Sequence, residues 1–179
     1  MILNKIDIRP ILRGHFSTLR NNAYLSPKLF WQDGLVFFAT PAALAVCVLM
    51  IGFHFRVDAV NGFLNVFSVL TGLLLNLLVL VLSMSTTKAP IQADPRMRSR
   101  LVGEIFSNVC FSVLVSISVV CVALFALSYM RSNPGATTGP IATFFLVALT
   151  TNFVLTLLMV LKRMYILISK EIESDSSSQ

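Results

Sequence analysis

The sequence has few charged residues, and four long stretches contain none. Only 12% of its 179 residues are Asp, Glu, Lys or Arg, and 56% are hydrophobic, whereas soluble domains carry about 25% charged residues. The charge-free stretches are residues 35–53, 63–84, 105–130 and 141–161. A helix needs about 20 apolar residues to cross a bilayer core. This scarcity of charge excludes an ordinary soluble domain and predicts four membrane-spanning helices.

Motifs for catalysis and cofactor binding are also missing. The sequence contains no Walker A loop, GxGxxG, HExxH or CxxC motif. His15 and His54 are expected on opposite sides of the membrane, where they cannot share a metal ion or a catalytic triad. Cys47, Cys110 and Cys121 fall inside predicted spans at spacings that suit neither zinc nor a redox pair. We therefore expect neither enzymatic activity nor a cofactor.

Asp, Glu, Lys and Arg are absent from the four predicted spans. Ion-coupled carriers usually keep such groups at membrane depth, because the coupled ion or proton must be bound there. Glu104 directly precedes the third stretch and follows Arg100 by four residues. It is expected either to form an interfacial ion pair with Arg100 or Lys162, or to place a carboxylate at a pore mouth. The pattern argues against coupled transport.

The positive charges are distributed asymmetrically. Of the 14 Lys and Arg residues, only Arg56 and Arg131 lie in the links that follow the first and third stretches. The positive-inside rule therefore places both termini in the cytoplasm, in agreement with an even number of spans. We expect a multi-pass protein of the plasma membrane, the inner membrane in bacteria, in contact with anionic headgroups. Because the charge is explained by topology, no direct nucleic-acid binding is expected.

The N-terminal segment, residues 1–34, is not a span. Its apolar residues recur at the helical spacing i, i+3, i+4, i+7 in Leu12, His15, Phe16 and Leu19. Pro10 suits the first turn of a helix. This pattern predicts a short amphipathic helix lying in the membrane interface, while a flexible basic tail is the alternative.

Residues 35–167 are predicted to form the transmembrane domain. The link between the first two spans is very short, so the four spans should form two antiparallel hairpins. Pro41 predicts a bend in the first span. The Ser-rich tail, residues 168–179, is predicted to be disordered. The expected fold class is an all-α membrane protein with four transmembrane helices and the N-terminal amphipathic helix.

Polar side chains inside the spans form two stripes. Facing lipid is costly for amides, so the stripes should face other helices or other subunits. They are expected to make dry interhelical hydrogen bonds or to line a water-filled path in an oligomer. The candidate interface or lumen residues are Asn61, Asn65, Ser68 and Asn76 in the second span, Asn108, Ser112 and Ser116 in the third, and Asn152 in the fourth.

A basic cluster is expected on the cytoplasmic side. It can anchor the protein to anionic lipid, or it can bind an acidic cytosolic partner. Its members are Arg96, Arg98, Arg100, Lys162 and Arg163.

The outline resembles that of small bacterial membrane effectors and membrane subunits, including those of anti-phage operons. This resemblance covers architecture only and rests on no motif. It implies a non-enzymatic, self-associating membrane subunit, a sensor or pore-type effector, that works with a cytosolic partner. A stand-alone small channel or facilitator is one alternative, and a membrane anchor or assembly factor is another.

Overall fold

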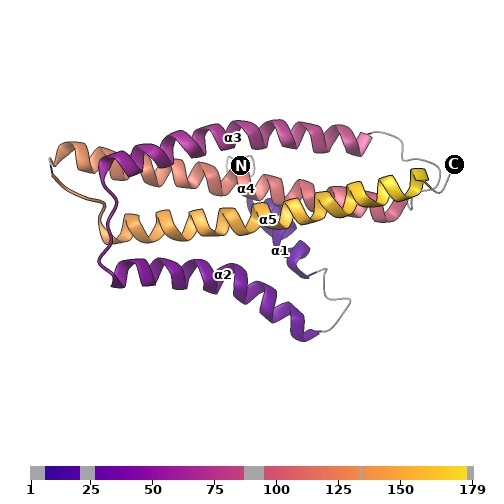
Figure 1. Cartoon of the computed structure of the whole chain (residues 1–179), viewed down its shortest axis with the longest axis horizontal. Coiled ribbons are helices and arrows are strands. Elements are labelled where there is room, and N and C mark those ends of the chain that lie inside the picture. Colours follow the sequence, from indigo (N-terminus) through magenta and orange to yellow (C-terminus); the bar gives the residue numbers. More distant parts are fainter. Residues whose placement is uncertain (1–6, 21–26, 87–94, 134, 177–179) are drawn as a thin grey trace.

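The protein is all-helical over the residues that the structure describes (Figure 1). The computed structural model describes residues 7–20, 27–86, 95–133 and 135–176, with side chains described for 7–18, 35–83, 99–133 and 135–169. The helices are α1 (Arg9–Arg20), α2 (Pro27–Met50), α3 (Val57–Thr86), α4 (Pro95–Ser132) and α5 (Pro140–Ser176). Three of them begin at a proline, which has no N–H to leave unbonded and a φ already suited to a helix. The prediction of an all-α chain is confirmed.

Three helices are long and apolar enough to cross a membrane. Their candidate spans are Val57–Ser83 in α3, Ser99–Ser132 in α4 and Pro140–Ser169 in α5. The apolar part of α2 among the described side chains, Leu35–Met50, is shorter. The molecule is thus compatible with a membrane protein of at least three spans. A fourth span in α2, the pairing into hairpins and the interfacial position of α1 belong to the proposal below.

Helix α4 lies at the centre of the bundle. It packs against α3, α5 and α1, while α2 packs against α5. The buried line of α3 repeats every seven residues, in Val60, Phe67, Leu74 and Val81. A seven-residue repeat keeps one face of a helix against its neighbour. Because lipid tails are as apolar as these side chains, the contact is stabilised mainly by close packing.

At the end of the bundle away from α1, hydrogen bonds join the segment between α2 and α3 to the segment between α4 and α5. The backbone N–H of Thr138 donates to the Phe55 carbonyl at 3.0 Å, and the Phe55 N–H donates to Thr138 Oγ1 at 2.9 Å. Thr138 Oγ1 also lies 2.7 Å from Thr143 Oγ1 at the start of α5. Gly52 turns the first link with a φ of 73°, a backbone conformation that favours glycine. These bonds join the α2–α3 link to the α4–α5 link.

Candidate functional site

A buried polar cluster joins α1 to α4. His15 Nδ1 lies 2.8 Å from Asn108 Oδ1, and the Thr18 hydroxyl reaches the same oxygen at 3.1 Å. The His15 ring stacks on Phe111, with 3.9 Å between ring centroids and 7° between planes. Helix α1 can approach α4 this closely because Gly14 has no side chain: a Cβ there would lie 2.9 Å from Ser107 Oγ. The contact therefore combines hydrogen bonding to the amide oxygen of Asn108 with ring stacking on Phe111.

Arg163 of α5 completes this cluster from the other side. Its Nη2 donates to the Thr18 carbonyl at 3.0 Å. That carbonyl is one of the last four of α1, which have no partner within the helix. Arg163 is only 5% exposed, so its charge needs a counter-charge nearby.

Glu104 supplies that counter-charge. Its Oε2 lies 3.2 Å from Arg163 Nη1, close enough for an ion pair although the angles are not those of a hydrogen bond. Its Oε1 accepts a bond from Arg100 Nε at 3.1 Å, one helical turn away. Glu104, which was expected either in an ion pair with Arg100 or Lys162 or at a pore mouth, is therefore bound between Arg100 and Arg163. Together these contacts connect α1, α4 and α5.

Burial controls the protonation of His15. The side chain is 2% exposed, and this loss of water lowers its pKa below the usual 6.5. The hydrogen bond to Asn108 acts in the opposite direction, and the positive charge of Arg163 lowers the pKa further. The imidazole is consequently neutral at neutral pH, and protonation would place a second cation beside Arg163.

The stripe predicted on the third span is buried inside the chain. Asn108, Ser112 and Ser116 are each 0% exposed. Ser116 Oγ lies 2.5 Å from Thr71 Oγ1 and 3.1 Å from the Phe67 carbonyl, both in α3. Asn108 Nδ2 and Ser112 Oγ are buried without a hydrogen-bond partner among the described residues. Within the chain, this stripe therefore makes α1–α4 and α3–α4 contacts.

The stripe predicted on the second span faces outward instead. Asn65, Ser68 and Asn76 are exposed, and Asn61 is half-buried. With 3.6 residues per turn, Asn65 and Asn76 lie about 140–160° around α3 from Val60, and Asn61 and Ser68 lie about 80–100° from it. The two stripes therefore do not face each other within one chain. On the α3 side, the hydrogen bonds to Ser116 of α4 come from Thr71 and the Phe67 carbonyl, neither of which was a predicted interface group.

Asn152 of α5 binds the backbone of α2. Its Nδ2 donates to the Phe37 carbonyl at 3.2 Å. Phe37 lies four residues before Pro41, which has no N–H to bond that carbonyl. Figure 1 shows α2 changing direction along its length, as expected for a proline inside a helix. Asn152 thus satisfies a carbonyl that the proline leaves free.

The predicted basic cluster is divided by the fold. Arg100 and Lys162 are exposed, whereas Arg163 lies inside and makes the contacts given above. The side chains of Arg96 and Arg98 lie outside the described residues. Over the described part of the chain, no group of three His, Cys, Asp or Glu side chains could hold a metal ion.

Two residues of the polar cluster, His15 and Thr18, were not identified as site residues from the sequence. The signal was present, because a histidine on the apolar face of an amphipathic helix needs a polar partner when that face is buried. The sequence matches no protein-family model, no curated protein and no solved structure. Its function must therefore follow from these contacts.

Proposed function

We propose that the chain is a non-enzymatic inner-membrane protein that self-associates through the outward stripe of α3, formed by Asn61, Asn65, Ser68 and Asn76. It serves as the membrane-embedded subunit of a complex with a cytosolic partner. Both termini lie in the cytoplasm. The observation that carries this proposal is the exposure of Asn65, Ser68 and Asn76 in a helix otherwise apolar enough to span a bilayer.

Four spans are proposed, with α2 as the first. Helix α2 has 24 residues, a length of about 36 Å at 1.5 Å per residue, against about 30 Å for the hydrocarbon core. Four spans place both termini on the side that carries most of the Lys and Arg residues. On that side, α1 would lie at the interface with its apolar face against α4.

The exposed amides favour a second copy of the chain over lipid. Lipid tails offer no hydrogen-bond partner, and interhelical hydrogen bonds in membranes contribute about 0.6–2 kcal/mol each. An asparagine side chain both donates and accepts, so the same stripe on two copies is self-complementary. Gly72 lies on this face, and a Cβ there would meet no atom within 4 Å, which leaves room for a second helix to approach closely.

The same observation supports a pore as the second candidate. Around the axis of a larger oligomer, the stripes of α3 would line the centre and hold water. Within one described chain, the α4 stripe is already packed against α1 and α3. A pore would therefore need several copies of α3.

Cross-linking and single-molecule counting in nanodiscs test the self-association. We expect replacing both Asn65 and Asn76 by Leu to weaken the oligomer about tenfold or more, equivalent to about 1.4 kcal/mol. Leu158→Val is the control, since Leu158 is exposed on α5 and lies outside the α3 stripe. A strictly monomeric wild-type chain would overturn the proposal. An oligomer unchanged by the paired substitution would exclude the α3 stripe as its interface.

Liposome flux separates a dry interface from a pore. Flux by the purified oligomer, lost in Asn76→Leu, supports a water-lined path along the stripe. An oligomer without flux supports a dry interface in a subunit that acts through its partner. Co-purification from cells with Arg100→Ala and Lys162→Ala variants tests whether the exposed basic residues hold that partner. A role in anti-phage defence is tested by phage plating on cells with and without the gene and its neighbours.

A further inference from the structure

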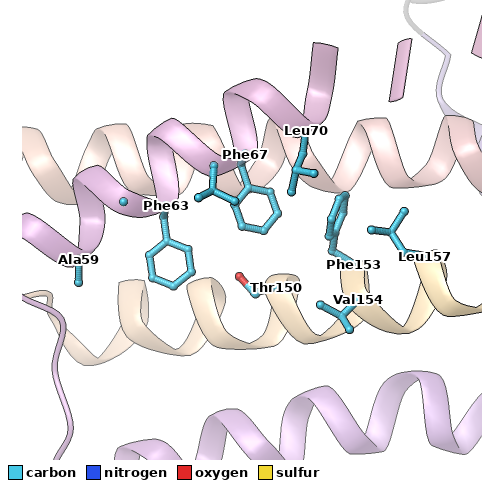
Figure 2. A pocket seen from close by; sticks show the side chains of 10 residues that line it. Ala59, Phe63, Phe67, Leu70, Thr150, Phe153, Val154 and Leu157 are labelled. Carbon is cyan, nitrogen blue, oxygen red and sulfur yellow. The ribbon is translucent and has the colours of Figure 1, made fainter. Parts of the chain in front are cut away.

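An apolar cavity of about 470 Å³ lies between α3 and α5 (Figure 2). Figure 2 shows Phe63 and Phe67 of α3 directed toward α5, with Phe153 of α5 beside Phe67. The rings of Phe67 and Phe153 are 5.1 Å apart, in an edge-to-face arrangement. Thr150 also lines the cavity, but its hydroxyl oxygen is buried, so the exposed lining is hydrocarbon.

The cavity arises from the packing around α4. The backbones of α3 and α5 each lie close to α4, and α3 and α5 meet only through long side chains such as Phe67 and Phe153 among the described residues. Ala59 and Gly62 are too small to fill the space left between the two helices, and a Cβ at Gly62 would meet no atom within 4 Å. Gly62, Val66 and Val154 are exposed, so the cavity opens on the outer surface of the bundle. On the proposed membrane placement, this surface faces lipid.

The volume of the cavity indicates what kind of molecule can occupy it. The cavity extends along α3 from Ala59 to Leu70, about 16 Å at the helical rise. A helix about 10 Å across would need about 1,300 Å³ over that length, nearly three times the space available. An acyl chain is thin enough to enter, and cavities of about 300–1,000 Å³ are typical of small-ligand sites. The shape therefore suits a lipid chain, because a whole helix does not fit inside the cavity.

Arg56 precedes Ala59, the first residue of α3 that lines the cavity, by three positions. Arg56 is exposed and precedes the first turn of α3, where its carbonyl accepts from the Val60 N–H at 3.1 Å. It lies seven residues before Phe63, a second residue of α3 that lines the cavity. The chain thus presents a cation where a lipid phosphate would lie above an acyl chain in the cavity.

We propose that the cavity between α3 and α5 binds one acyl chain of an anionic phospholipid whose phosphate pairs with Arg56. The lipid belongs to the leaflet opposite the termini. This site rests on the membrane placement proposed above but not on self-association, because it lies on the side of α3 away from the polar stripe. Binding gains dispersion contacts with the aromatic rings and a charge-assisted hydrogen bond at the phosphate.

Native mass spectrometry of the full chain, released from nanodiscs of phosphatidylglycerol or phosphatidylcholine, tests the site. We expect the wild type to retain one phosphatidylglycerol that Gly62→Phe loses, with affinity reduced at least tenfold. Gly103→Phe is the matched control, since it adds the same ring at an open position on α4. Val154→Trp fills the cavity from α5 and serves as a second variant should Gly62→Phe not fold. Equal retention by the cavity variants and the control would overturn the proposal.

The headgroup contact has its own control. Arg56→Gln should abolish the preference for phosphatidylglycerol over phosphatidylcholine, whereas Arg131→Gln, at the other arginine on that side, should keep it. A preference unchanged in Arg56→Gln would exclude Arg56 as the phosphate partner. Retention by the Asn65→Leu and Asn76→Leu double variant separates this site from the oligomer, and membrane flotation of the wild type checks the placement on which the site depends.

Discussion

Replacing Asn152 by Leu is expected to destabilise the protein by about 1–2 kcal/mol, a factor of about 5–30 in the folded-to-unfolded ratio. The amide donates to the Phe37 carbonyl at 3.2 Å, which Pro41 leaves without its backbone partner. Leu has a similar volume and cannot donate. The carbonyl would then remain unbonded where no water is available to replace the amide.

Restoring the N–H that Pro41 lacks tests whether the proline is what makes the Asn152 amide necessary. In Pro41→Ala, the alanine N–H can bond the Phe37 carbonyl directly, so Asn152→Leu should then cost less than about 0.5 kcal/mol. Unfolding in mixed micelles of mild detergent and dodecyl sulfate, followed by helix circular dichroism, measures all four members of the cycle. Thr151→Val is the control, because the Thr151 hydroxyl donates within α5 to the Val147 carbonyl. An equal cost of Asn152→Leu in both backgrounds would refute the account.

Two further predictions concern the cluster at α1. The lowered pKa of His15 means that the unfolded chain binds a proton more readily than the folded one, so stability is complete above about pH 6.5 and falls as the pH drops below it. Thermal unfolding at stepped pH should show this loss, and it should disappear in His15→Phe but not in His54→Gln. Separately, Glu104→Gln should cost about 3–5 kcal/mol by leaving the buried Arg163 charge without its partner. The double variant Glu104→Gln, Arg163→Met should recover much of that loss; additive losses would show that the two side chains do not act as a pair.

The helices were predictable because each one is indicated by the composition of a single continuous stretch of sequence. Charge-free stretches locate α3, α4 and α5, and the structure extends each helix beyond the stretch, since polar turns can continue outside a bilayer core. Pro41 and the shared helical face of Leu12 and His15 could also be read from the sequence. These features depend on neighbours along the chain.

Whether each polar stripe faces the inside or the outside of the bundle could not be predicted in the same way. Periodicity places Asn65 and Asn76 on one side of their helix, but it does not say how that helix is rotated in the bundle. In a soluble protein the apolar face would decide this. Here Val60 on the buried side and Val66 on the outer side are equally apolar, because lipid and core demand the same side chains. Specific hydrogen bonds, such as the one between Thr71 and Ser116, therefore help to determine which face of α3 turns toward α4.

The contacts of α1 also impose an order on biosynthesis. Helix α1 is made before the other four described helices, yet His15 bonds a residue 93 positions later and Thr18 is bonded by one 145 positions later. At about 5–20 residues per second, Arg163 leaves the ribosome roughly 7–30 s after Thr18. Throughout that time α1 has no complete binding site, and its buried histidine must remain in water or at the membrane surface. Complete docking of α1 is therefore a late event, because it requires both α4 and α5 to be in place.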